Sequence, residues 1–370
     1  MQDSLFGDDL PLPAAAAPAA ARPVPAEAAA PAQADAPASA RRASRPKNAP
    51  KVEPAAVDDA LRAQAARLPP GLRLGTSSWH FPGWAGLVWN GDYDGTVLSR
   101  HGLAAYAQHP LLRTVSLDRN FYRALTASQF AAYAAQVPED FRFVVKAPSV
   151  VSDALVRAED GRGQRPNPAF LNPQLAVQDF VQPALDGLGH RVGALVFQLS
   201  PLPAALLARM PEVLARLDAM LGALPALRAT APDGVIAVEV RNPEFLTPEF
   251  ARVLKAHGAT YCLGLHPRLP AIEDQLPLLR ALWPGPLVCR WNLNRLHGAY
   301  GYEEAKGLYE PFDRLVDPDP HTRQVLARVI AGTTQAGQAA YVTINNKAEG
   351  SAPRSVQALV DAVLAPPPAS

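Results

Sequence analysis

Short hydrophobic runs alternate with longer amphipathic stretches from residue 72 almost to the end of the chain. The runs are rich in β-branched and aromatic residues, which is typical of strands. They occupy residues 72–78, 113–117, 141–147, 193–199, 235–240, 260–266, 286–291 and 340–345. The run VIAV at 235–238 has no polar residue within it. Such runs predict parallel strands that are buried on both faces.

The stretches between these runs predict helices. They cover residues 96–109, 126–136, 173–186, 202–222, 247–257, 271–283, 320–336 and 353–364. Several begin with a helix-capping residue or a proline, such as Thr126, Thr247-Pro248 and Asp319-Pro320. Eight strand-helix units in alternation predict an α/β fold of the (β/α)8 TIM-barrel type, as a single domain at residues 70–366. An open doubly wound sheet is the alternative, but the sequence GTSSWHFPGW after the first strand is not a glycine-rich phosphate loop.

The region before the first strand has a different composition. Residues 10–66 are rich in alanine and proline, contain no aromatic residue and have few large apolar side chains. A segment of this kind buries too little apolar surface to offset its chain entropy. We therefore expect residues 10–66 to be a disordered linker.

The first nine residues, MQDSLFGDD, differ from this linker. Gln2 followed by Leu5 and Phe6 resembles the short peptide with which bacterial replication and repair proteins bind the DNA sliding clamp. A flexible tail can insert two apolar anchors into a surface pocket while the glutamine amide pairs at its rim. Residues 1–9 are therefore a candidate clamp-binding peptide, and the alternative is an unstructured start of the chain.

Charge and cysteine usage narrow the class of protein. The chain has 35 Lys/Arg against 34 Asp/Glu, so net charge does not indicate a nucleic-acid partner. A basic cluster at residues 41–51 is interpreted as a solvated patch, with a weak nucleic-acid contact as the alternative. The two cysteines, Cys262 and Cys289, lie in apolar runs and are expected to be core residues. With no signal peptide or transmembrane run, we expect a cytoplasmic protein without a membrane partner.

Polar residues stand at the end of every predicted strand. In a parallel barrel these positions meet at one mouth, where active sites form. In chain order they are Ser77, Ser78, Trp79 and His80; Asp118 and Asn120; Lys146; Gln198; Glu239 and Arg241; His266; Arg290 and Asn292; and Asn345, Asn346 and Lys347. A polar pocket at the barrel mouth is the prediction.

The residue types at the mouth favour an anionic ligand. Lys146, Arg241, Arg290 and Lys347 would hold a phosphate or carboxylate. The remaining binding candidates are Trp79 by stacking and Asn120, Tyr122, Gln198, Asn292, Asn345 and Asn346 by polar contacts. These residues predict an enzyme of the hydrolase type, with an anionic or phosphate-bearing substrate.

Four residues are candidates for catalysis. Asp118 or Glu239 would act as a general base or a metal ligand, and His80 or His266 would move protons. No motif such as HExxH signals a metal, so a divalent cation remains an open cofactor assignment. Glu239 and Arg241 lie on the same strand face, and an arginine lowers a carboxylate pKa. This favours an orienting role for Glu239 over a proton donor, and a salt bridge at the rim is the structural alternative.

At these positions the sequence resembles the YecE-like family of bacterial barrel proteins, a domain of unknown function, over residues 72–364. The resemblance is carried by motifs in a fixed order: Gly75-Thr76-Ser77 with Trp79 and Pro82-Gly83-Trp84, Asn120-Phe121-Tyr122-Arg123, Lys146, Gln198, Glu239 with Arg241, and Asn345-Asn346 followed by Gly350 and Ala352. The resemblance implies the barrel and a ligand site at its mouth, and it implies no particular reaction.

The sequence departs from the pattern of this family at two places, so the resemblance implies a divergent member. Many relatives have Glu-x-Asn-x-Thr before Phe-Tyr, whereas here Ser116, Asp118 and Asn120 occupy those places. Relatives also have Arg-x-His-Gly after the seventh strand, whereas here Arg290 is followed by Asn292. Two other functions stay open on the sequence alone. One is a non-catalytic replication or repair accessory protein recruited to the clamp, and the other is a glycosidase-like hydrolase using paired carboxylates.

Overall fold

The computed structural model describes residues 51–157 and 163–365, and these residues form a closed barrel of eight parallel strands. The strands are β1 (Leu72–Thr76), β2 (Thr114–Leu117), β3 (Arg142–Lys146), β6 (Val192–Gln198), β7 (Val235–Glu239), β8 (Thr260–Leu265), β9 (Leu287–Trp291) and β10 (Ala340–Ile344). Each lies beside the next along the chain, and β1 closes the barrel on β10. The predicted (β/α)8 fold is confirmed.

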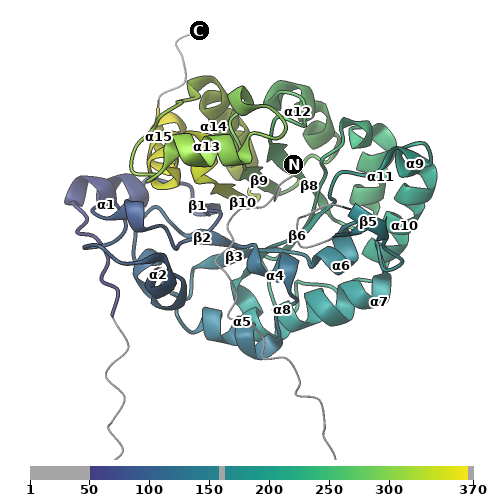
Figure 1. Cartoon of the computed structure of the whole chain (residues 1–370), viewed down its shortest axis with the longest axis horizontal. Coiled ribbons are helices and arrows are strands. Elements are labelled where there is room, and N and C mark those ends of the chain that lie inside the picture. The colour runs from purple at the N-terminus through teal and green to yellow at the C-terminus, as the bar shows by residue number, and fades with distance from the viewer. Residues whose placement is uncertain (1–50, 158–162, 366–370) are drawn as a thin grey trace, which may run out of the picture.

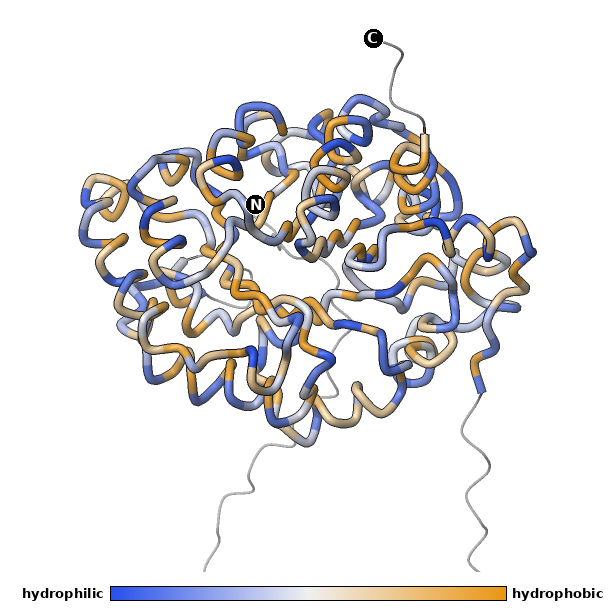
Figure 2. Tube along the Cα trace, turned by 180° about the vertical axis from the view of Figure 1, so that it is seen from behind, coloured by the Kyte–Doolittle hydropathy of each residue, from blue (hydrophilic) through white to orange (hydrophobic). Residues whose placement is uncertain are grey.

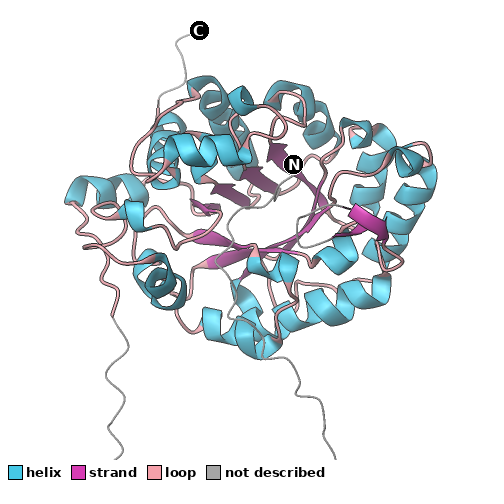
Figure 3. Ribbon diagram, in the orientation of Figure 1, coloured by secondary structure: helices cyan, strands magenta, loops and turns pink. Residues whose placement is uncertain are grey.

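Helices surround the strands as a continuous outer ring (Figures 1 and 3). They are α1 (Asp59–Ala66), α2 (Gly95–His101), α3 (Leu103–Tyr106), α4 (Arg119–Tyr122), α5 (Ala127–Ala134), α6 (Ser149–Ser152), α7 (Pro173–Ala176), α8 (Gln182–Leu188), α9 (Ala204–Leu207), α10 (Met210–Gly222), α11 (Pro248–Ala256), α12 (Ile272–Ala281), α13 (Tyr302–Tyr309), α14 (Pro320–Gln335) and α15 (Ala352–Leu364). A hairpin of β4 (Leu155–Arg157) and β5 (Gly163–Pro166) follows α6.

At three of the predicted helix starts, a capping side chain forms a hydrogen bond with a backbone N–H of the first helical turn. The side chain of Thr126 accepts from the backbone N–H of Gln129, whose own side chain returns the bond. Thr247 and Asp319 cap α11 and α14 by accepting from the backbone N–H groups of Phe250 and Thr322. The short helices α4, α6 and α13 were not predicted, because one or two turns carry too little periodicity to be recognised.

The core has two compartments. Inside the barrel, one set of side chains packs together: Val144, Ala194, Val196, Val235, Ala237, Cys262, Val288 and Tyr341. A larger set lies between the strands and the helices. The hydropathy colouring of the chain agrees, since the helices alternate hydrophobic and hydrophilic positions (Figure 2). Both cysteines are buried and unbridged, as expected for core residues.

The predicted end of the linker at residue 66 is wrong. Val52 and Ala55 are buried, and the backbone N–H of Ala55 donates to the carbonyl of Val88 at 2.9 Å. In α1, Gln64 donates to Asp361 at 2.5 Å. The partners come from distant parts of the chain, so the local alanine-rich composition did not reveal them. Residues 1–50 lie outside the described residues.

None of the helices formed by the described residues combines the length and hydrophobicity needed to span a bilayer.

Gly75 provides a test of the barrel closure. A Cβ at Gly75 would lie 1.8 Å from the carbonyl oxygen of Thr114 on the neighbouring strand. We expect Gly75→Ala to lower the free energy of unfolding by at least about 2 kcal/mol, measured by urea denaturation. Gly307, on the exposed face of α13, has open space at its Cβ position and is the matched control. Gly307→Ala should raise stability by up to about 1 kcal/mol. Equal effects of the two substitutions would contradict this account of the closure.

Candidate functional site

The side chains that enter the barrel change from apolar to polar toward the C-terminal ends of the strands. Because side chains alternate along a strand, Lys146 points to the same side as Val144, and Gln198 to the same side as Val196. On β9 the side chains of Val288, Arg290 and Asn292 follow one another in the same row by the same rule. The polar mouth therefore lies directly above the apolar side chains that pack inside the barrel.

Arg290 is the centre of a buried ion-pair network. Its guanidinium donates from Nη1 to Glu239 Oε2 at 2.6 Å. From Nη2 it donates to both oxygens of Asp118, at 2.9 and 2.7 Å. Ser116 donates to the same Asp118 carboxylate at 2.6 Å. One arginine thus links β9 to β7 and to the end of β2 across the barrel.

Glu239 is fully buried and is shared by two arginines. Arg241 Nη2 lies 2.7 Å from Glu239 Oε1, and Asn292 donates to the same oxygen at 3.3 Å. Gln198 Oε1 accepts from Arg290 at 3.0 Å and from Arg241 at 3.3 Å. The amide of Gln198 therefore holds the two guanidinium groups in place on both sides of the carboxylate.

The ionisation states follow from burial and pairing. Burial by itself raises the pKa of Glu239, but Arg241 and Arg290 together hold that pKa below its ordinary value. The pKa of Arg290 is raised, because Asp118 and Glu239 outweigh the effect of its burial. Glu239 is therefore an ionised acceptor, as expected from its arginine neighbour, and has little capacity to donate a proton.

Lys146 ends β3 next to this network. It is buried, and burial lowers its pKa to about 7, with Asp118 acting in the opposite direction and Arg290 in the same direction. Its Nζ lies 3.6 Å from the centre of the Phe121 ring. A lysine in this environment exchanges its proton near neutral pH.

A cavity of about 290 Å³ opens above the network. Most of the predicted site residues line it, namely Trp79, His80, Asp118, Tyr122, Lys146, Gln198, Arg241, Arg290, Asn292, Asn345 and Lys347. Among the predicted residues, Glu239, His266, Asn120 and Asn346 are not part of its lining. The mouth thus brings together residues from distant parts of the sequence.

Two of the predicted asparagines support the scaffold. Asn120 donates to the carbonyl of Lys146 at 2.7 Å and accepts from the N–H of Leu125 at 2.8 Å. Asn346 accepts from the indole N–H of Trp84 at 3.2 Å and from the N–H of Ala352 at 2.8 Å. Both side chains are buried below the cavity wall, so their position differs from the predicted ligand contact.

The two histidines differ in their surroundings. His266 is buried, its Nδ1 accepts from the N–H of Arg268, and burial together with Arg241 lowers its pKa to about 2. It therefore stays neutral at physiological pH and is a poor proton carrier. His80 lines the cavity and is within 2.6 Å of the Ser78 hydroxyl, so it keeps access to a ligand.

Aromatic side chains form part of the cavity wall. Trp79 is buried, with its indole N–H on the carbonyl of Leu98 at 3.1 Å and its ring edge against Tyr133. Tyr122 is 52% exposed at the rim. The other two tryptophans of this loop, Trp84 and Trp89, are buried with their rings stacked at 6.3 Å between centroids.

Several lining residues were not predicted, because they come from helices that cover the mouth. They are Ser99 of α2, Arg119 of α4, Arg123, Gln129 and Tyr133 of α5, and Tyr302 of α13. Arg119 directly follows the strand-end residue Asp118 and Arg123 lies four residues after Arg119, so chain proximity was the available signal for these two.

Within residues 51–157 and 163–365, no three His, Cys, Asp or Glu side chains come together as metal ligands. Asp118 and Glu239 instead face the guanidinium of Arg290. The predicted partner-binding residues Gln2, Leu5 and Phe6 lie outside the described residues.

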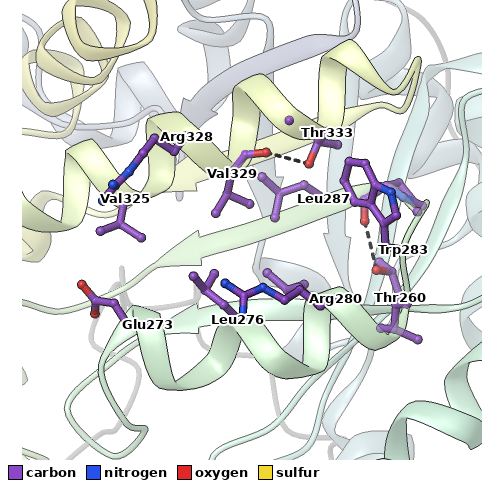
Figure 4. Close-up of a pocket in the computed structure, with 15 residues that line it drawn as sticks. Thr260, Glu273, Leu276, Arg280, Trp283, Leu287, Val325, Arg328, Val329 and Thr333 are labelled. Carbon is purple, nitrogen blue, oxygen red and sulfur yellow. Dashed lines mark hydrogen bonds between the residues drawn. The ribbon is translucent and has the colours of Figure 1, made fainter. Parts of the chain in front are cut away.

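A larger cavity, of about 430 Å³, lies between α12 and α14 at the opposite end of the barrel (Figure 4). Thr260 and Leu287, at the beginnings of β8 and β9, line it. Its walls are mainly apolar, with Glu273, Arg280 and Arg328 along helices α12 and α14. This cavity lacks the convergent polar groups of the mouth, so its greater size does not make it the better candidate.

The altered ionisation of Lys146 predicts a pH dependence of stability. Its pKa is about 7 in the folded chain against an ordinary value of 10.5, so between these values the unfolded chain binds more protons. Stability from this residue should therefore rise with pH above about 7, by at most about 1.4 kcal/mol per pH unit. We expect Lys146→Met to remove that component in urea denaturation at pH 7, 8 and 9. Lys255→Met, at an exposed position on α11, is the control and should keep the wild-type dependence of the free energy of unfolding on pH. The same pH dependence in wild type and Lys146→Met would contradict the prediction.

Comparison with known proteins agrees with the barrel. The family described as "Protein of unknown function DUF72" matches residues 73–369. A DUF72 family protein from Enterococcus faecalis V583 has 18% identity, with 80% of this chain and 96% of that chain covered and a TM-score of 0.51. A DUF72 family protein from Thermotoga maritima MSB8 also has 18% identity, with 78% and 96% covered and a TM-score of 0.49. A search of curated proteins gave no match.

At 18% identity the Enterococcus faecalis structure with a TM-score of 0.51 supports the fold and leaves the chemistry open. The family match covers the strand-end motifs from Gly75 to Ala352, so the resemblance to YecE-like proteins is confirmed. The chain belongs to the DUF72 family of proteins of unknown function.

Proposed function

We propose that the barrel mouth binds a small anionic compound, a carboxylate or a phosphate, and is the active site of an enzyme. The observation that carries this proposal is a pair of buried donors without a partner among the described residues. They are Nε2 of Gln198 and Nη1 of Arg241. Both residues line the cavity, and both are held in position by their other hydrogen bonds.

An anion would satisfy these donors at little cost in side-chain order. A buried donor that lacks a partner lowers the stability of the folded chain by about 1–3 kcal/mol. An ionised acceptor forms stronger hydrogen bonds than a neutral one. Lys347, which is buried and lines the same cavity, adds a further positive charge. Arg290 contributes differently from the sequence prediction, because both of its terminal nitrogens already bind Asp118 and Glu239.

The residues left for chemistry at the cavity are Asp118, His80 and Lys146. Asp118 retains 32% exposure of its side chain, and His80 lines the same cavity. A hydrolytic reaction, as expected from the sequence, would rely on one of these groups to activate water. The glycosidase alternative is disfavoured, because such enzymes need one carboxyl group held protonated, whereas Glu239 and Asp118 share Arg290.

Anion binding is tested by calorimetric titration with inorganic phosphate and with pyruvate. We expect binding of at least one of them, and we expect Lys347→Met to weaken it by about tenfold, since a charged hydrogen bond contributes about 1.5–3 kcal/mol. Lys255→Met, at an exposed position on α11, should bind as the wild type does. Binding that is absent in the wild type, or unchanged in Lys347→Met, would overturn the proposal.

A further inference from the structure

Lys146 occupies a position suited to covalent chemistry. It is the last residue of β3, is 2% exposed, and lines the mouth cavity. Val144, two residues earlier, packs inside the barrel, so the Lys146 side chain rises from the barrel interior into the mouth. Leu117 pairs with Val145 in the sheet, which places Asp118 beside Lys146 on the neighbouring strand.

The charged groups around Lys146 come from three other strands. They are Asp118 after β2, Glu239 and Arg241 from β7, and Arg290 from β9. The two carboxylates are engaged by arginine at 2.6–2.9 Å, so their charge is already balanced. The Phe121 ring lies under Nζ and keeps one side of the amine away from water.

These surroundings favour a neutral amine. Burial lowers the pKa of Lys146 to about 7, so a large share of the side chain is deprotonated at pH 7–8. A desolvated lysine beside other cations is the arrangement that activates an amine as a nucleophile toward carbonyl carbon. An amine placed only to hold an anion would work better with its charge retained.

Building on the proposed anion site, we propose that Lys146 forms an imine with the carbonyl group of a small anionic substrate, such as a 2-oxo acid or a phosphorylated aldehyde or ketone. Nζ attacks the carbonyl carbon and forms a C–N bond, and one amine proton passes to the carbonyl oxygen as the C=O π bond breaks. The second amine proton also passes to that oxygen, the C–O bond breaks, and water leaves as the C=N bond forms. The step needs no oxidant or reductant.

The neighbouring donors fit such a substrate. Lys146 pairs in the sheet with Val196, and Gln198 stands two residues further along the same strand face. The anionic group on Gln198 and Arg241 would therefore lie close to the amine. A cavity of about 290 Å³ accommodates a compound of a few carbon atoms.

The test is reductive trapping of the full chain with pyruvate and cyanoborohydride at pH 7.5, followed by peptide mapping. Cyanoborohydride supplies hydride to the C=N bond and leaves a stable secondary amine. The chain has six lysines, Lys47, Lys51, Lys146, Lys255, Lys306 and Lys347, so each site can be scored separately. We expect at least about tenfold more label on Lys146 than on exposed Lys255, because an ordinary lysine keeps little free amine at this pH.

Hydroxyacetone, which is similar in size and neutral, should label Lys146 much more weakly than pyruvate. Lys146→Met should lose the label, whereas Lys255→Met should keep the label on Lys146, with the folding of both variants checked by their urea transitions. Pyruvate or phosphate binding without label on Lys146, or equal label on all six lysines, would overturn the imine while leaving the anion site standing. If neither anion binds and no label forms, both the imine and the proposed function are wrong.

Discussion

The burial of Glu239 is the constraint on which the mouth of this barrel depends. A carboxylate taken out of water costs several kcal/mol unless it is paired and hydrogen-bonded. Glu239 is 0% exposed and has Arg241, Arg290 and Asn292 around it. β7 carries the carboxylate and β9 carries Arg290, both near the C-terminal end of the strand. The ion pair therefore fixes the positions of these two strand ends relative to each other at the barrel mouth.

The same pairing determines what remains available to a ligand. Both terminal nitrogens of Arg290 are engaged by Asp118 and Glu239, and Gln198 uses its oxygen to hold both guanidinium groups. The anion-binding capacity therefore rests on Arg241 Nη1 and Gln198 Nε2, which have no partner among the described residues, together with the cavity lysines. The network is a scaffold for the site as well as part of it.

The sequence predicted the architecture well because each strand and each helix start is specified by residues that are close together in the chain. Runs such as 235–240 and capping residues such as Thr126 identify elements without tertiary information. The strand ends also predicted most of the cavity lining. The sequence left open in which direction each strand-end side chain points and how deeply it is buried. Asn120 and His266 follow strands as Asp118 does, yet Asn120 holds the backbone of Lys146 and His266 is turned against the Arg268 amide. Those roles depend on contacts between separate segments, as does the ordering of residues 51–66.

The most direct test of this account is a crystal structure determined with inorganic phosphate. We predict phosphate density within hydrogen-bond distance, about 3 Å, of Gln198 Nε2 and Arg241 Nη1, with the Arg290 bridge between Asp118 and Glu239 unchanged. Phosphate bound elsewhere, with both of those donors turned to protein acceptors, would contradict it.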